Sequence, residues 1–237
     1  MHLKSIIIHS QSFPTKEQYP FNQSILHLTP VIEFKTLTTF FVGENGTGKS
    51  TLLEAIAKKC QIYIWRDSNK KRFQANQHEG DLYRYISIEW TDGRVPGSYF
   101  ESDSFRYFSY NVDEWAASDP GVLKYLGGQS LVTQSHGQSL IAYFKARSKV
   151  RGLYLLDEPE TALSPKSQLE LIKLMVQMSR TGSVQFIIAT HSPILMACPQ
   201  STILKFEDSK PINQINYEDT DHFLIYKDFL EDRSKYL

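Results

Sequence analysis

The chain has 237 residues, 41% of them hydrophobic, and its 26 lysines and arginines balance its 26 aspartates and glutamates. Zero net charge excludes a global basic field for binding DNA or RNA, and it excludes the acidic excess that keeps chains disordered. The length allows a buried core in one large domain or two small ones. Neither a signal peptide nor a run of about 18 apolar residues is present, so no membrane span is expected. Two cysteines, Cys60 and Cys198, are too few for a disulfide framework and are expected to be reduced thiols in a cytoplasmic protein.

The first predicted elements are short apolar runs separated by turn residues, a pattern that favours an antiparallel β layer. These runs are Ser5–His9, Ile25–Leu28 and Val31–Phe34. The denser β-branched and aromatic run Leu37–Val42 predicts a buried strand. A glycine-rich loop leads from this strand to a predicted helix at Ser50–Lys59.

The middle of the chain gives weaker signals. Alternating apolar residues predict strands at Gln61–Trp65, Tyr83–Trp90 and Val95–Phe100. The polar stretch after the first of these strands contains Lys70, Lys71 and Arg72. This basic cluster fits a solvated loop, and the alternative is a patch that binds phosphate or nucleic acid.

The last third of the chain alternates predicted helices with apolar runs. The runs Gly152–Leu156 and Val184–Ala189 predict buried strands, and a helix is predicted at Gln138–Arg147. Ser-Pro pairs at 164–165 and 192–193 predict helix starts, and Gly182 is expected to end the first of these two helices. Strands that alternate with helices predict a mostly parallel α/β sheet.

The tail, residues 217–237, contains an apolar stripe at helical spacing. Its members are Phe223, Leu224, Phe229 and Leu230. Packing of this stripe against the core is the favoured interpretation, and a docking surface for a partner is the alternative.

The strongest motif follows the predicted strand at 37–42 and fits the phosphate-loop pattern G-x-x-x-x-G-K-[ST] at every fixed position. Its residues are Gly43, Glu44, Asn45, Gly46, Thr47, Gly48, Lys49 and Ser50, followed by Thr51. Glycines let several backbone N–H groups point at phosphates, and the helix N-terminus adds partial positive charge. Lys49 is expected to reach the β and γ phosphates, Ser50 to ligate Mg²⁺, and Thr51 to lie near the α phosphate.

A second motif is the apolar strand that ends in Asp157 and Glu158. In a nucleotide site this is the Walker B pattern. Asp157 is then predicted to hold Mg²⁺, and Glu158 is predicted to act as the general base that polarises the attacking water.

Three weaker signals accompany these motifs. Ser135-His136-Gly137-Gln138 precedes a predicted helix, Ala162-Leu163-Ser164 follows the acidic pair, and His191 follows the strand at 184–189. In this order the motifs resemble those of ABC-type ATPases, with S-H-G-Q in place of L-S-G-G-Q. The segments Asp157–Glu160 and Thr190–Pro193 resemble stand-alone ATPases of the AAA-15/AAA-21 type, relatives of SMC and overcoming-lysogenization-defect ATPases. The resemblance covers roughly residues 37 to 200.

The resemblance implies an ABC-type P-loop NTPase fold with a mostly parallel central sheet, an N-terminal antiparallel β layer and a small helical signature lobe. Residues 1–237 would form one domain, with 1–60 and 150–237 as the nucleotide-binding core and 61–149 as an inserted lobe. Two chains would associate head to tail on ATP and Mg²⁺. Ser135 and Gly137 of one chain would complete the ATP site of the other, and His191 would be the switch histidine.

Two features of the family pattern are missing. No glutamine stands at a strand end where a Q-loop is expected: Gln74 and Gln77 lie in the polar loop, and Glu101 occupies the expected place. No adenine-stacking aromatic is assigned, although Phe13, Tyr19 and Phe21 are candidates.

Three functions are compatible with these motifs. The full series favours an ATP hydrolase that dimerises on nucleotide and drives or gates a partner protein, in DNA repair or anti-phage defence. An ATP-binding subunit of a membrane transporter is the alternative. A small-molecule kinase would leave the Asp157-Glu158 pair, the signature and His191 unexplained. Autonomous DNA binding is not expected from a neutral chain.

Overall fold

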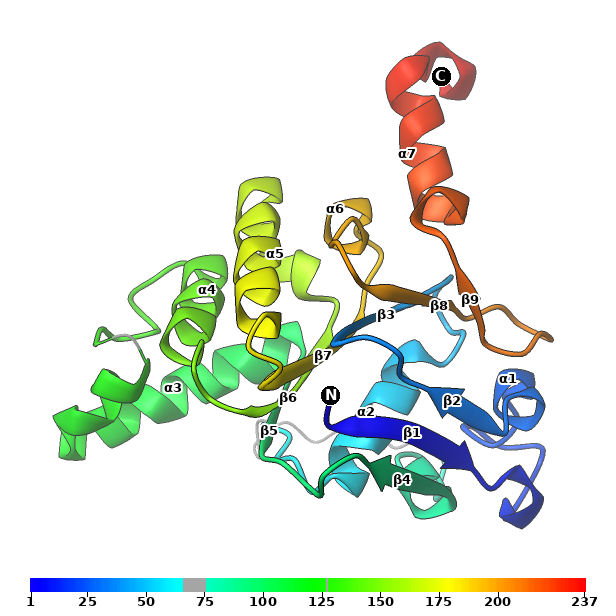
Figure 1. Ribbon diagram of the computed structural model, residues 1–237, viewed down its shortest axis with the longest axis horizontal. Coiled ribbons are helices and arrows are strands. Elements are labelled where there is room, and N and C mark those ends of the chain that lie inside the picture. Colours follow the sequence, from blue (N-terminus) through cyan, green and yellow to red (C-terminus); the bar gives the residue numbers. More distant parts are fainter. Residues whose placement is uncertain (66–75, 127) are drawn as a thin grey trace.

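The computed structural model describes residues 1–65, 76–126 and 128–237. Within these ranges, nine strands form two sheets (Figure 1). In chain order the strands are β1 Leu3–Ile8, β2 Val31–Glu33, β3 Thr38–Val42, β4 Ile86–Trp90, β5 Gly97–Phe100, β6 Gly152–Asp157, β7 Val184–Ala189, β8 Thr202–Lys205 and β9 Asn213–Ile215. The helices are α1 Ser24–Leu28, α2 Lys49–Lys59, α3 Ser102–Ser118, α4 His136–Ala146, α5 Pro165–Ser179, α6 Pro193–Met196 and α7 Asp221–Glu231.

The central sheet has the order β5-β6-β7-β3-β8-β9, and only β9 runs antiparallel to its neighbour. The smaller sheet has the order β2-β1-β4 and is antiparallel throughout. The predicted fold class is therefore confirmed: a mixed α/β fold with a mostly parallel central sheet and an N-terminal antiparallel layer.

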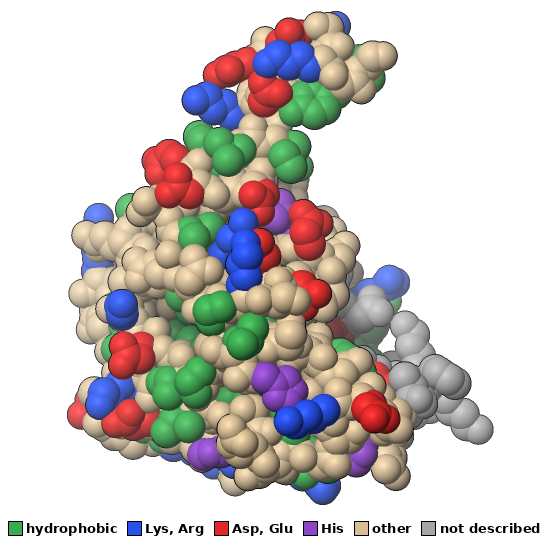
Figure 2. Space-filling view, turned by 90° about the vertical axis from the view of Figure 1, so that its right-hand side faces the viewer, with side chains coloured by type: hydrophobic (Ala, Val, Ile, Leu, Met, Phe, Trp, Pro, Cys, Tyr) green, Lys and Arg blue, Asp and Glu red, His purple; other side chains and the backbone are tan. Residues whose placement is uncertain are grey.

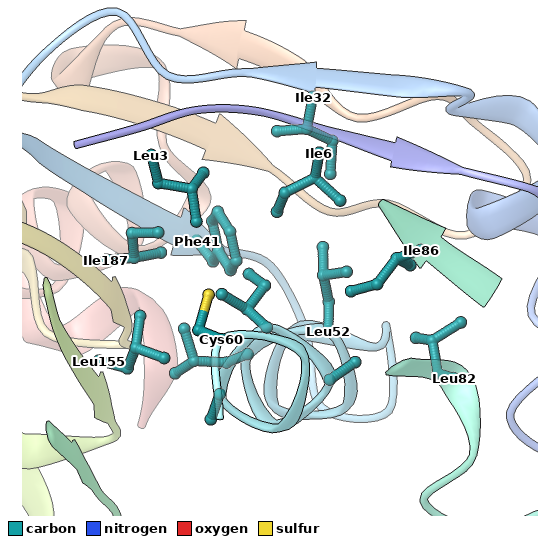
Figure 3. Packing of buried hydrophobic residues seen from close by; sticks show 14 of the residues in the cluster. Leu3, Ile6, Ile32, Phe41, Leu52, Cys60, Leu82, Ile86, Leu155 and Ile187 are labelled. Carbon is teal, nitrogen blue, oxygen red and sulfur yellow. The ribbon is translucent and has the colours of Figure 1, made fainter. Parts of the chain in front are cut away.

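Helix α2 lies between the two sheets and supplies the centre of one hydrophobic core (Figure 3). Leu52 and Ile56 are fully buried, and they share this core with Ile6 of β1 and Phe41 of β3. A second core lies on the opposite face of the central sheet, where Phe40 packs with residues of α3, α4 and α5. Neighbours Phe40 and Phe41 face opposite cores because successive strand residues point to opposite sides.

Two strands within the predicted insert 61–149 belong to the sheets. β4 pairs with β1, and β5 pairs with β6. Ile86 of β4 and Tyr99 of β5 are both buried in the core that contains α2. Among the described residues of this segment, the α-helices lie within 102–146, where α3 and α4 pack beside α5 (Figure 1). The basic cluster Lys70, Lys71 and Arg72 lies outside the described residues.

Three local predictions were wrong. Ile25–Leu28 belongs to helix α1, since a four-residue apolar run is too short to reveal its period. Gln61–Trp65 makes only an isolated bridge, from Ile64 to Tyr99. The stripe on α7 does not pack against the core: Leu224, Phe229 and Leu230 are 49%, 42% and 78% exposed. Helix α7 projects from the body instead, as Figures 1 and 2 show.

Candidate active site

The predicted phosphate loop joins β3 to α2 at the carboxyl end of the central sheet. Gly43 and Gly48 have φ values of +141° and +96°, which side chains rarely adopt. A Cβ on Gly43 would lie 2.0 Å from the carbonyl oxygen of Phe206, so the loop passes directly against the end of β8. The backbone N–H of Phe206 donates to Val42 at 2.7 Å. The loop is therefore held in shape by the neighbouring strand.

Lys49 lies inside the loop. Its Nζ donates to the carbonyl oxygens of Gly43 at 2.7 Å and Glu44 at 2.8 Å, and the residue is buried. Burial lowers the pKa of the Lys49 ammonium, and the negative charges of Glu158 and Asp157 oppose this shift. The cation thus lies between the loop and the acidic end of β6, where phosphate oxygens would meet it.

Ser50 and Asp157 connect the two main motifs. The Ser50 hydroxyl donates to Oδ1 of Asp157 at 2.9 Å, and the Tyr99 hydroxyl reaches Oδ2 at 3.3 Å. Burial raises the pKa of Asp157 to about 7, with Glu101 and Glu158 adding to the shift and the two hydroxyl contacts opposing it. A divalent cation would favour the ionised carboxylate.

The donor atoms at this position fit Mg²⁺. A hydroxyl and a carboxylate oxygen are hard ligands, and Mg²⁺ in nucleotide sites is commonly held by one or two side chains together with phosphate oxygens. No cluster of three or more His, Cys, Asp or Glu side chains with metal-binding geometry occurs in the described parts of the chain. Ser50 and Asp157 would therefore hold the ion together with a bound nucleotide.

Glu158 follows the strand in a left-handed conformation, with φ +47° and ψ 52°. The Glu158 side chain is 41% exposed, and its Oε1 lies 3.6 Å from Nε2 of His191. The two adjacent acids thus diverge: Asp157 points to the buried Ser50, and Glu158 points to the open side, where water has access. This is the arrangement that a metal ligand and a general base require.

Glu160 is a functional candidate that sequence reasoning missed. Its carboxylate accepts the backbone N–H of His191 at 2.6 Å and the hydroxyl of Thr190 at 2.8 Å. Burial raises the pKa of Glu160, and these hydrogen bonds oppose the shift. A third acid, two residues after Glu158, was the available signal. Glu160 fixes the position of His191 relative to Glu158.

The histidines also form an unpredicted pair. Nδ1 of His191 lies 2.9 Å from Nε2 of His222, in the first turn of α7. The two residues are separated by 31 positions, and no sequence signal links them.

The signature residues lie at the start of α4. Ser135 caps the helix, and its side chain exchanges hydrogen bonds with Gln138 in a capping box. A Cβ on Gly137 would be 2.8 Å from the carbonyl oxygen of Ala162, in the turn after Glu158. The contacts found for Ser135 and Gly137 among the described residues are with α4 and this turn, and they do not include the phosphate loop of the same chain.

The structure shows where the candidates for the Q-loop residue and the adenine-stacking aromatic lie. The Tyr99 hydroxyl contacts Glu101 Oε2 at 3.4 Å as well as Asp157, so Glu101 lies at the acidic strand end. Gln77 bonds to His78 on the surface, and Gln74 lies outside the described residues. Among the aromatic candidates, Phe21 is fully buried and Phe13 packs against its ring.

Tyr19 is 38% exposed and bonds to Thr51 Oγ1 at 2.5 Å. It lines a pocket of about 680 Å³ that adjoins the phosphate loop through Asn45, Gly46 and Thr47. Of the three aromatic candidates, Tyr19 therefore lies where an adenine base could stack beside the loop.

Comparison with known proteins agrees with the resemblance of the motifs to those of ABC-type ATPases. A family model described as "AAA domain, putative AbiEii toxin, Type IV TA system" matches residues 138–197. The thiamine import ATP-binding protein ThiQ of Ruegeria sp. (strain TM1040) is 26% identical over 167 residues, which are 64% of this chain and 69% of ThiQ. The family match and this relative support a P-loop ATPase of the ABC type.

Other relatives support this. The ferric enterobactin transport ATP-binding protein FepC of Escherichia coli (strain K12) is 24% identical over 170 residues, which are 65% of this chain and 62% of FepC. The structure of cbiO1 from Clostridium perfringens, part of the ABC transporter complex cbiONQ, superposes with a TM-score of 0.52 at 19% identity. The superposition covers 99% of this chain and 97% of cbiO1, and it shows a shared fold.

The similarity to ABC-type ATP-binding proteins indicates ATP binding and hydrolysis. Among the described residues, no helix has the length and apolar content needed to cross a membrane.

Proposed function

We propose that this ATPase hydrolyses ATP with Mg²⁺ at the site between the phosphate loop and the ends of β6 and β7. The observation that carries the proposal is the Ser50–Asp157 hydrogen bond of 2.9 Å, which joins the Walker A and Walker B motifs. Lys49 and the amides of residues 43–51 bind the phosphates. When bound, Mg²⁺ would neutralise charge on the β and γ phosphates. Glu158 accepts the proton of the attacking water, and His191 contacts the γ-phosphate.

We further propose that two chains associate head to tail on ATP. Support comes from the position of Ser135 and Gly137, which lie at an anion-ready helix start away from their own phosphate loop. In the dimer, this helix start would face the γ-phosphate held by the second chain. Charge on the bound nucleotide would thereby favour association.

Sedimentation tests the dimer. The Glu158→Gln variant with MgATP is expected to sediment as a dimer and the same variant without nucleotide as a monomer. Adding Ser135→Arg should prevent the dimer and leave ATP binding to the monomer intact. A monomer in the Glu158→Gln variant with saturating MgATP would contradict the head-to-tail arrangement.

For the biological role, we propose an ATP-gated switch or motor for a partner protein in the cytoplasm, in a DNA-repair or anti-phage defence setting. The matched family model, whose description names a toxin of a type IV system, supports a defence role. The neutral chain favours action through a partner over autonomous DNA binding.

A transporter subunit is the second candidate, because the similar curated proteins carry import and transport names. Purification of the Glu158→Gln variant trapped with ATP separates the two roles. Recovery of a nuclease or other effector supports the switch, and recovery of an integral membrane protein supports the transporter.

A further inference from the structure

The first turn of α7 is fixed to the body, although the rest of the helix projects from it (Figure 2). Thr220 is buried and caps the helix by accepting the N–H of Phe223 at 3.3 Å. Asp221 pairs with Nζ of Lys205, at the end of β8, at 2.9 Å. These contacts hold His222, the second residue of α7, beside the ends of the central strands.

His222 contacts the His191 ring at Nδ1, whereas Glu158 lies near the other ring nitrogen, Nε2. Nε2 of His222 lies 2.9 Å from Nδ1 of His191, and the ring centroids are 5.0 Å apart. The opposite nitrogen of His191, Nε2, has no hydrogen-bond partner among the described residues and lies 3.6 Å from Glu158 Oε1. One nitrogen of His191 is therefore engaged by α7, while the other lies beside Glu158, where the proposed function places the γ-phosphate.

The proton positions of the two rings are linked. Burial lowers the pKa of both histidines, and the charge of Lys49 adds to this, so each ring carries one N–H. When Nε2–H of His222 donates to Nδ1 of His191, the proton of His191 must lie on Nε2. With the opposite tautomer, His191 would present a bare nitrogen to Glu158 and to phosphate oxygens, and both contacts would be repulsive.

We propose that His222 is a positioning residue for ATP hydrolysis: it holds His191 as the Nε2–H tautomer with its ring directed at the γ-phosphate. This inference rests on the proposed role of His191. It also means that α7, which contributes no buried residue of its own, affects the site through one hydrogen bond. Residues that orient a functional imidazole through its second nitrogen commonly affect activity by about 10- to 100-fold.

Steady-state kinetics of His222→Phe and His222→Gln test the proposal. His222→Phe keeps the ring bulk and loses the donor, so kcat should fall about 10-fold or more while KM for ATP changes by less than about twofold. His222→Gln places an amide N–H near the position of Nε2 and should recover most of the loss. His9→Phe removes a surface imidazole that bonds Ser87 on the antiparallel sheet, and it should leave the kinetics unchanged.

Histidine-selective ¹⁵N NMR of the wild-type protein provides a readout that does not depend on a folded variant. In the wild-type protein, the His191 ring is expected to be protonated on Nε2, and in His222→Phe this preference should be lost. Protonation of wild-type His191 on Nδ1, or an unchanged kcat in folded His222→Phe, would overturn the inference. Turnover that survives in His191→Ala would instead contradict the proposed role of His191, so the two failures are distinguishable.

Discussion

Helices α2 and α7 each have eleven residues, yet they occupy opposite environments. Six residues of α2 are buried, and five of them are apolar residues in the core that Figure 3 shows, whereas none of α7 is buried. Both sequences carry apolar residues at helical spacing. The difference shows that the pattern alone does not distinguish a helix enclosed by sheets from one that meets the body only at its first turn.

The largest expected effect is at the first residue of α2. Lys49→Ala should lower kcat/KM for ATP by at least about 100-fold, because it removes the buried cation of the phosphate loop. Lys227→Ala, on the exposed part of α7, is the matched control and should leave turnover unchanged. Similar losses in both variants would contradict the functional contrast between the helices.

The next effect is on stability. Ile56 is fully buried in α2, so Ile56→Ala should lower the free energy of unfolding by about 2–5 kcal/mol. Leu230 on α7 is 78% exposed, and Leu230→Ala should change the free energy of unfolding by less than about 0.5 kcal/mol. Urea unfolding measures both, and equal destabilisation would show that α7 packs on the body in solution.

Asp157, which contacts α2, and Asp228, which lies on α7, should differ in how they change the stability of the fold with pH. The pKa of Asp157 is raised by burial to about 7, so its ionisation destabilises the fold as pH rises from about 4 to 7. Asp157→Asn should therefore remain more stable above pH 7 than the wild type, by roughly 2–4 kcal/mol, with a flatter melting profile between pH 5 and 8.

The control is Asp228 on α7, whose pKa is lowered by hydrogen bonds from Lys235 and Tyr236. Asp228→Asn should leave the profile between pH 5 and 8 unchanged, since the carboxylate is ionised throughout. In the wild type, Mg²⁺ affinity should weaken as pH falls below about 7, because the metal requires ionised Asp157. Isothermal titration with MgATP measures this, and a pH-independent affinity would contradict the pairing of Asp157 with the ion.

The smallest expected effect is at the end of the chain. Lys235 pairs with Asp228 at 2.6 Å, but both side chains are at least 40% exposed, so solvent screens the pair. Lys235→Ala should not measurably change the melting temperature or turnover. A clear drop in melting temperature would show that the turn after α7 contributes to the fold.

The candidate site residues that could be predicted from the sequence are those that belong to short local motifs. The glycines before Lys49 and the acids that end β6 follow from short-range rules, and the structure brings Ser50 and Asp157 together as expected. The contacts of Glu160 with Thr190 and of His222 with His191 join segments about 30 residues apart. Their geometry depends on the strand order, which local patterns do not encode.

The exposure of α7 was unpredictable for a related reason. Apolar spacing indicates which residues share a helix face, and burial depends on what lies opposite that face. The strands β8 and β9 were also not predicted; β8 completes the wall behind Gly43, and β9 forms the edge of the sheet.

Glu160 has a consequence for communication between the two nucleotides of the proposed dimer. Its carboxylate holds the backbone of His191, and the same short turn presents the carbonyl of Ala162 to Gly137 across a gap too small for a Cβ. In the proposed dimer, movement of His191 on loss of the γ-phosphate would pass through Glu160 and this turn to the start of α4, which would contact the nucleotide of the second chain. Hydrolysis at one site would thereby be transmitted to the other.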